Sequence, residues 1–213
     1  MVNFLNIGKH MVLMETATEK MTRLLLLYPE KKWKQAELAE RSGCSKAFAS
    51  KFTKKMVAEG ILARPKPQEI MLLGGTKLLN AWCSMRKLPK PIYIKTNLSK
   101  PQIEKMLKKE KGCCLTLFSA AWHRIKFMKT ERIEAYVEKS KAKKFIKKFG
   151  LATKNPTNFI IFPSDSHVFE NSEKISGICL VNIVQNYADL ISSGGTGMRV
   201  AYELGKKYNL RGV

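Results

Sequence analysis

Acidic residues are scarce in this chain, whose 213 residues include 17 Asp and Glu but 39 Lys and Arg. The formal net charge of +22 excludes a neutral surface and indicates a polyanionic partner. Histidine is rarer still, with three residues, and none stands at zinc-ligand spacing from a cysteine. We therefore expect no metal and no cofactor.

Cysteine pairs and long apolar runs are also missing. None of the five cysteines stands in a Cys-x-x-Cys pair, which predicts buried thiols in a reducing compartment. The longest aliphatic run, at residues 24–27, is far too short to span a bilayer, and the first twenty residues lack a secretory cleavage pattern. We expect a cytoplasmic protein without membrane contact. The cysteines are Cys44, Cys83, Cys113, Cys114 and Cys179.

The positive charge is unevenly distributed along the chain. Residues 1–90 hold 17 Lys and Arg against 7 Asp and Glu, and residues 91–155 hold 17 against 5. Residues 156–213 hold 5 of each kind and are neutral overall. The excess lies in the first two segments, so we expect a different role for the last.

A first helix is predicted over residues 16–28, where apolar residues recur at helical spacing. Thr16 or Thr18 can cap this helix, and Pro29 ends it.

A pair of short helices is predicted next. The first of them spans residues 34–42, and Gly43 suits the left-handed position after it. Ser45 is a good N-cap for the following helix. Two short helices with such a turn form a helix-turn-helix, whose second helix enters the DNA major groove.

The helix after Ser45 has one apolar stripe, formed by Ala49, Phe52 and Met56. Phe48 either packs on a thymine methyl or belongs to the core, and we favour the core. The remaining face carries lysines and no acid until Glu59, which indicates contact with a negative partner.

The residues expected to contact DNA divide by position on this helix. Those near its N-terminal end would meet base edges, and Phe48 would share in base choice if it is exposed. Lys54 and Lys55 would reach phosphates, which raises affinity without regard to sequence. The helix contacts are Ser45, Lys46, Ala47, Ser50, Lys51, Lys54 and Lys55.

A hairpin is predicted directly after this helix, with strands at residues 61–64 and 69–73 and a turn at 65–68. In that position a hairpin is the wing of a winged helix. Arg64 and Lys66 lie at or near its tip, where they would contact the minor groove or the backbone. The alternative is a plain hairpin with two solvated charges.

A closing helix capped by Thr76 and a stiff Pro-Lys-Pro linker at residues 89–91 follow. We place a domain boundary there. The predicted fold class is α+β, with a winged helix-turn-helix domain at residues 1–90 and a mixed α+β domain at residues 91–213.

The second domain is predicted to alternate strands and helices. Strands are expected at 92–96, 132–137, 158–163, 167–171 and 177–182, and helices at 99–111, 115–127, 139–150, 183–193 and 195–208. The lysines from Lys100 to Lys148 are either a second nucleic-acid contact or solvated helix faces. Phe145 and Phe149 fall at core spacing, so we expect no base-stacking platform.

The last hundred residues carry a more specific pattern, in which an "SAA" helix precedes a "VQNYADL" helix, a glycine-rich turn and an "AYEL" helix. This pattern resembles the C-terminal domain of AbiEi-type antitoxins, which are transcriptional regulators of type IV toxin–antitoxin systems. With the helix-turn-helix in front, the resemblance covers most of the chain from about residue 16. The matching residues are Ser119, Ala120, Ala121, Val184, Gln185, Tyr187, Asp189, Leu190, Gly194, Gly195, Gly197, Arg199, Ala201 and Leu204.

The resemblance implies a sequence-specific double-stranded DNA-binding repressor of its own promoter. It also implies a functional partner, a nucleotidyltransferase-like toxin encoded next door, which the antitoxin counters without a tight complex. The residues by themselves indicate only DNA binding and a second, less charged module.

Catalytic motifs are not evident. The stretch "SGGTGMR" at residues 193–199 lacks the Lys-Ser/Thr of a phosphate loop and follows no predicted strand, so we interpret it as an inter-helix turn. Asp165, His167, Asp189 and Glu203 show no paired-carboxylate spacing. We expect no enzyme. The alternatives are a nucleic-acid-processing enzyme or RNA-binding factor using residues 91–155, and a protein-interaction module in residues 156–213.

Overall fold

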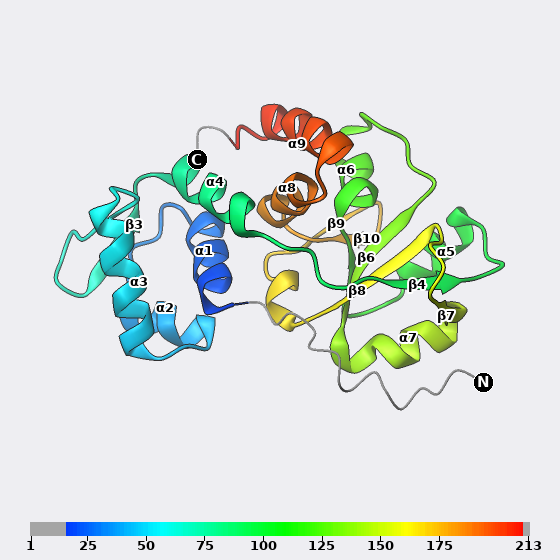
Figure 1. Cartoon of the computed structure of the whole chain (residues 1–213), viewed down its shortest axis with the longest axis horizontal. Coiled ribbons are helices and arrows are strands. Elements are labelled where there is room, and N and C mark those ends of the chain that lie inside the picture. The colour runs from blue at the N-terminus through cyan, green and yellow to red at the C-terminus, as the bar shows by residue number, and fades with distance from the viewer. Residues whose placement is uncertain (1–15, 211–213) are drawn as a thin grey trace.

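Figure 1 shows the computed structural model of the chain, which describes residues 16–210. These residues form a mixed α+β structure with two sheets. The expectations about residues 1–15, including the missing secretory cleavage pattern, lie outside the described residues. Within residues 16–210, every helix is too short or too polar to span a bilayer.

The N-terminal segment, residues 16–90, is mainly helical and carries the smaller sheet, with strand order β1-β3-β2. The predicted cap of α1 forms. Thr16 Oγ1 accepts a hydrogen bond from the Glu19 amide at the start of α1, and the Glu19 carboxylate accepts one from the Thr16 amide. The elements are α1 (Ala17–Leu27), β1 (Trp33–Lys34), α2 (Gln35–Ser42), α3 (Lys46–Ala58), β2 (Leu62–Ala63), β3 (Glu69–Leu72) and α4 (Gly75–Met85).

The turn between α2 and α3 also follows the prediction. Gly43 has φ of 64°, a left-handed conformation that costs glycine little. Ser45 Oγ accepts from the Phe48 amide at 3.1 Å and so caps α3. The predicted cap of α4 is wrong, because α4 begins one residue before Thr76 and its N-cap, Gly74, makes no side-chain hydrogen bond.

Strand β1 was missed from sequence. Trp33, which lies between the first two predicted helices, pairs with Ile70 of β3 and is fully buried, so it anchors the small sheet. The two strands of the hairpin, β2 and β3, pair antiparallel with Leu62 opposite Leu72.

The C-terminal segment, residues 91–210, is built on a seven-stranded mixed sheet of order β7-β4-β8-β6-β5-β10-β9. Its central pair, β6 and β8, is parallel, and so are β5 and β10. The elements are β4 (Ile92–Lys95), α5 (Lys100–Leu107), β5 (Cys113–Leu115), α6 (Leu117–Ile125), β6 (Ile133–Glu138), η2 (Lys139–Lys141), α7 (Ala142–Phe149), β7 (Leu151–Thr153), β8 (Phe159–Ser164), η3 (Ser166–Phe169), β9 (Glu173–Ile175), β10 (Ile178–Leu180), α8 (Ile183–Ser192) and α9 (Gly195–Lys207).

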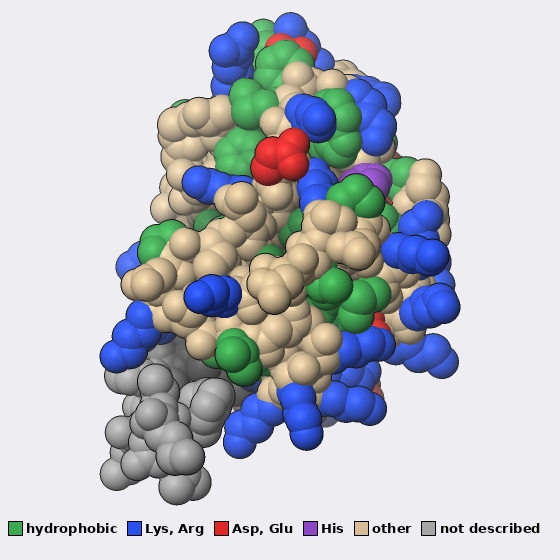
Figure 2. All heavy atoms as spheres, turned by 90° about the vertical axis from the view of Figure 1, so that its right-hand side faces the viewer, with side chains coloured by type: hydrophobic (Ala, Val, Ile, Leu, Met, Phe, Trp, Pro, Cys, Tyr) green, Lys and Arg blue, Asp and Glu red, His purple; other side chains and the backbone are tan. Residues whose placement is uncertain are grey.

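Helices cover the two faces of this sheet unequally. Helices α5 and α7 pack on one face through Ile103, Phe145 and Phe149, and α6 and η3 pack on the other, with α8 and α9 packed against α6 (Figure 1). Figure 2 views the sheet end of the molecule, where Lys and Arg side chains crowd the lower and right edges and acidic side chains are few. The strand predicted at residues 167–171 is wrong, since residues 166–169 form the 3-10 turn η3 after β8.

Helix α8 belongs to both segments. Its Val184 and Ala188 lie in the hydrophobic core of α1, α2, α3 and α4, together with Leu210, and its Leu190 packs with α9. The predicted boundary at residue 90 falls in the connection between α4 and β4, yet the two segments share this helix. Their division into separate domains stays a prediction.

Candidate nucleic-acid interface

One face of α3 points away from the protein. Ala49, Phe52 and Met56 are buried as predicted, and Thr53 is buried with them. Ser50 is half-buried. The other predicted contacts on this helix are exposed; they are Ser45, Lys46, Ala47, Lys51, Lys54 and Lys55.

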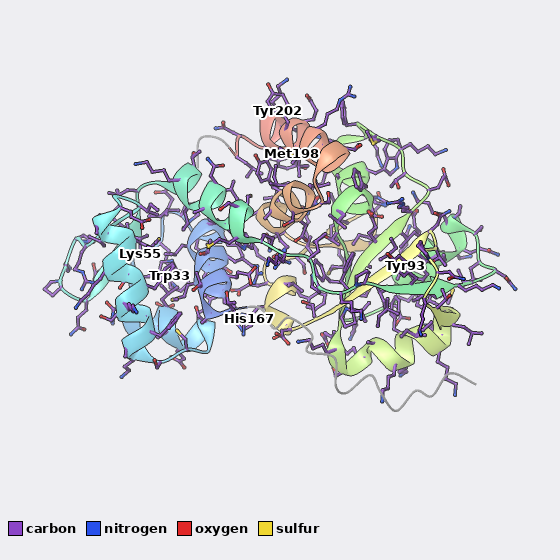
Figure 3. All side chains as sticks on the ribbon, in the orientation of Figure 1. Trp33, Lys55, Tyr93, His167, Met198 and Tyr202 are labelled. Atoms are coloured by element: carbon purple, nitrogen blue, oxygen red, sulfur yellow. A yellow bond between two sulfur atoms is a disulfide. The ribbon has the colours of Figure 1, made fainter. Side chains whose placement is uncertain are left out.

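The exposed lysines of α3 are almost unneutralised. Lys55 Nζ lies 3.8 Å from Glu59 Oε1, and its side chain is 71% exposed. Within residues 16–210, Lys46, Lys51 and Lys54 make no ion pair. Figure 3 shows Lys55 on α3, at the end of the molecule opposite Tyr93 of β4. The helix therefore presents a positive surface that the protein itself leaves uncovered.

The hairpin is fixed beside α3 by a glutamine that sequence reasoning missed. Gln35 Oε1 accepts from Thr53 Oγ1 of α3 at 3.3 Å and from Arg64 Nη2 of the hairpin at 3.4 Å. Arg64 Nη1 also donates to the carbonyl oxygen of Pro67 at 2.8 Å. Arg64 and Lys66 are both exposed. Nothing in the spacing of Gln35 distinguishes it from any polar residue that begins a helix.

The preference for Phe48 in the core is wrong, because its side chain is 43% exposed. It points away from the buried stripe of α3 and lines a cleft of about 690 Å³ between the two segments. Met85, which is 56% exposed, lines the same cleft, as do Pro163 and Asp165 from the sheet side. Phe48 therefore faces the cleft between the two segments, and its part in base choice stays a prediction.

A second concave region, of about 520 Å³, lies against the face of the large sheet that α6 covers. Tyr93 and Glu134 line it, and the glycine-rich turn before α9 forms one wall. Glu134 is 2% exposed and accepts from the Ser119 amide at 3.2 Å, yet burial raises the pKa of its carboxyl to about 7. Among the residues that line this groove, Glu134 is the only acid.

The glycine-rich turn is an inter-helix connection, as interpreted from sequence. It joins α8 to α9, and Asn182 caps α8 by accepting from the Gln185 amide at 2.8 Å. Across residues 16–210, no three His, Cys, Asp or Glu side chains gather as a metal site would require. Asp189 is fully buried, and Asp165 pairs with Lys139 at 2.9 Å.

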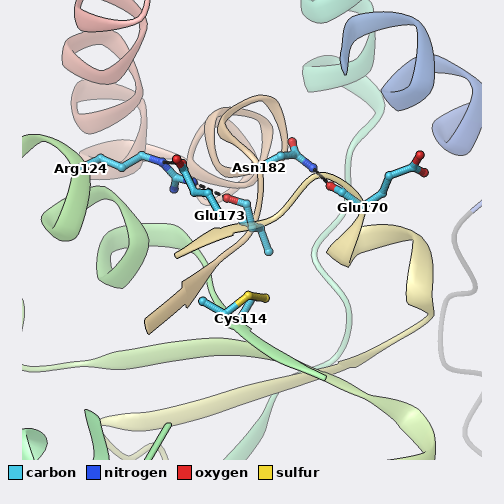
Figure 4. Close-up of a disulfide and its surroundings, with 7 residues drawn as sticks. Cys114, Arg124, Glu170, Glu173 and Asn182 are labelled. Atoms are coloured by element: carbon cyan, nitrogen blue, oxygen red, sulfur yellow. Dashed lines mark hydrogen bonds and ion pairs between the residues drawn. A yellow bond between two sulfur atoms is a disulfide. The ribbon is translucent and has the colours of Figure 1, made fainter. Parts of the chain in front are cut away.

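The expectation of five reduced thiols is wrong for two of them. Cys114 of β5 and Cys179 of β10 form a disulfide across neighbouring strands, with Cα atoms 4.5 Å apart (Figure 4). The two lie 65 residues apart in the chain, and only the pairing of Leu115 with Leu180 brings them together. Cys44, Cys83 and Cys113 are free.

Comparisons of the chain with protein-family models, curated proteins and solved structures found no match. The resemblance to AbiEi-type antitoxins therefore stays a prediction from sequence.

Proposed function

We propose that the chain is a winged helix-turn-helix regulator that binds double-stranded DNA, with α3 in the major groove and the β2–β3 hairpin as the wing. The observation that carries the proposal is the exposed, almost unneutralised lysine face of α3. A helix of 13 residues is about 20 Å long, and the major groove admits an α-helix. The order α2, tight turn, α3, hairpin is that of the motif.

The residues of the proposed interface have different roles, which follow from their positions on α3 and on the hairpin. Lys46, Ala47 and Lys51 occupy the first turns of α3, where a recognition helix contacts base edges. Lys54 and Lys55 lie one turn further along and would hold phosphates. Arg64 is held by Gln35 and Pro67, so the wing would approach the DNA with its tip already ordered.

The biological role that we propose is repression of the chain's own promoter as the antitoxin of a type IV pair. This part rests on the "SAA" and "VQNYADL" pattern alone. A cytoplasmic location and a nucleotidyltransferase-like toxin as functional partner belong to the same proposal. Reading the neighbouring gene tests the toxin part independently of DNA binding.

The experiment that tests DNA binding is a gel shift with the duplex upstream of the gene, at two salt concentrations, with random duplex and RNA hairpins as competitors. Lys46→Ala/Lys51→Ala should weaken operator binding by roughly 1–3 kcal/mol per good base contact and relax base preference. The matched control, Lys77→Ala/Lys129→Ala, removes the same charge from exposed positions outside α3 and the hairpin. It should change binding little.

Two results would count against the proposal. Equal losses on operator and random duplex would show that Lys46 and Lys51 hold only phosphates. A preference of the wild type for RNA hairpins over duplex DNA would favour the RNA-binding alternative.

A further inference from the structure

Nine exposed lysines lie on α5, on the segment that follows it, on η2 and on α7, and we name them the basic face; they are Lys105, Lys108, Lys109, Lys111, Lys141, Lys143, Lys144, Lys147 and Lys148. Both helices lie on the same face of the large sheet, and their apolar sides share one core with Phe159 and Ile161. The lysines point outward because Ala142, Phe145, Ile146 and Phe149 occupy the inner side of α7.

The two lysine-bearing regions, around α5 and around α7, are in contact. Lys148 of α7 pairs with Glu110, which follows α5. A Cβ placed on Gly112 would meet the side chains of Glu138 and Lys141, so the segment after α5 lies directly against the start of α7. Figure 1 shows α5 and α7 together at the sheet end of the molecule.

Little acidity balances this surface. Glu110 pairs with Lys148, and Glu138 pairs with Lys141 at 2.6 Å. Within residues 16–210, the other seven lysines of the basic face make no ion pair. Helix α7 contains four lysines and no acid in eight residues, whereas a helix that only needs to be soluble gains from mixed signs on its wet face.

Three observations indicate which kind of ligand the basic face would bind. Aromatic stacking with single strands is excluded at α7, because Phe145 and Phe149 are 4% and 1% exposed and stack on each other inside the core. A membrane-surface helix would insert its apolar side into lipid, and here that side is already packed on the sheet. Lysine ammonium groups one helical turn apart suit the closely spaced phosphates of a duplex.

We propose that the basic face is a second binding surface for double-stranded DNA, which reads no sequence and grips the phosphate backbone. It lies at the opposite end of the molecule from α3 (Figure 1). One chain therefore holds two duplex segments, one through α3 and one through the basic face. The proposal for the basic face is argued from its own lysines and does not depend on α3. Only the assignment of α3 as the first DNA-binding surface rests on the proposed function.

The test is the binding stoichiometry of the full chain with a short operator duplex and a short random duplex, followed by sedimentation as the salt concentration is raised. The variant Lys108→Gln/Lys109→Gln/Lys144→Gln/Lys147→Gln removes four unpaired charges from the basic face. Its matched control is Lys32→Gln/Lys77→Gln/Lys87→Gln/Lys90→Gln, whose lysines are exposed elsewhere.

We expect wild type and control to take up two duplexes at low salt, and the basic-face variant to take up one. The affinity for the second duplex should fall roughly tenfold or more in the variant. Its salt slope should flatten by about 0.9 for each phosphate that a lysine no longer neutralises. Lys46→Ala/Lys51→Ala should lose operator preference and keep the second, sequence-independent event.

Several outcomes would overturn the inference. They are a single duplex bound by wild type at every salt concentration, equal behaviour of the basic-face variant and its control, and tighter binding of this face to single strands or to phosphatidylserine vesicles. If Lys46→Ala/Lys51→Ala loses nothing while the basic-face variant loses all binding, the second surface exists and the role of α3 fails.

Discussion

Arg86 Nε lies 3.0 Å from Asp189 Oδ1 in the interior, and this ion pair joins the end of α4 to α8. Both side chains also have other hydrogen-bonding partners. Arg86 also reaches Glu19 Oε1 at 3.0 Å and Tyr136 Oη at 2.7 Å, and Asp189 Oδ2 accepts from Thr116 Oγ1 at 2.7 Å. The N-terminal and C-terminal segments are therefore connected by charge as well as by packing.

Removing the charge of Asp189 should destabilise the fold strongly. Asp189→Asn leaves Arg86 buried with only Glu19 as a counter-ion, and breaking a buried pair costs about 3–5 kcal/mol. The free energy of unfolding in urea measures this. Glu59→Gln, which removes the partner of exposed Lys55, should change that free energy by less than about 0.5 kcal/mol. Similar losses in the two variants would show that the interior pair contributes little.

The raised pKa of Glu134 should make the stability of the protein depend on pH. Burial raises the pKa of its carboxyl from 4.5 to about 7, so the folded state binds the proton more tightly than the unfolded state. Its contribution to stability is fully present below pH 4.5 and is lost as the pH rises through 7.

Glu134→Gln keeps a neutral side chain at every pH. Relative to wild type, the variant should match at pH 4 and be more stable by about 1–3 kcal/mol at pH 8, measured by urea unfolding at both pH values. Glu131→Gln, with a 69% exposed side chain, should show no such difference. A constant offset between the Glu134 variant and wild type would contradict the raised pKa.

Thiol titration should distinguish the cysteines. In denaturant without reductant, the three free thiols should react, and all five cysteines should react after reduction. In the native protein Cys44 should react first. Burial raises the pKa of Cys83 to about 12 and raises that of Cys113 further, which suppresses their thiolates. Five reactive thiols before reduction would show that Cys114 and Cys179 are not bonded.

Substitutions of Lys66 and Arg64 in the wing should affect DNA binding to different extents. Lys66→Ala removes one exposed charge, so duplex affinity should fall uniformly across sequences and the salt slope should decrease by about 0.9. Arg64→Ala should cost more, because it also frees the turn from Gln35 and Pro67. Gel shifts over a salt series compare the two variants. Unchanged slopes in both would indicate that the hairpin does not touch DNA.

Sequence reasoning succeeded where the signal is local. The caps Thr16, Ser45 and Asn182 each accept from an amide three residues along the chain, and the buried stripe of α3 follows from helical spacing. The exposed face of α3 is the complement of that stripe, so most of the candidate interface could be placed in advance.

Features that depend on distant partners could not be found in this way. Strand β1 exists because Trp33 meets Ile70, and the disulfide exists because β5 and β10 are neighbours. Phe48 has a side chain typical of a core, yet its position on α3 leaves it in the cleft beside Met85. These placements follow from tertiary contacts, and no periodic pattern of apolar residues in the sequence predicts them.

Helix α8 inserts Val184 and Ala188 into the core of the first four helices, while its Leu190 packs with α9. Cutting the chain near residue 90 would leave a cavity in the core of the N-terminal fragment. It would also expose Val184 and Ala188 to solvent on the C-terminal fragment. Heat should consequently melt both halves in one cooperative transition, and a duplex clamped by α3 would protect the distant sheet from unfolding as well.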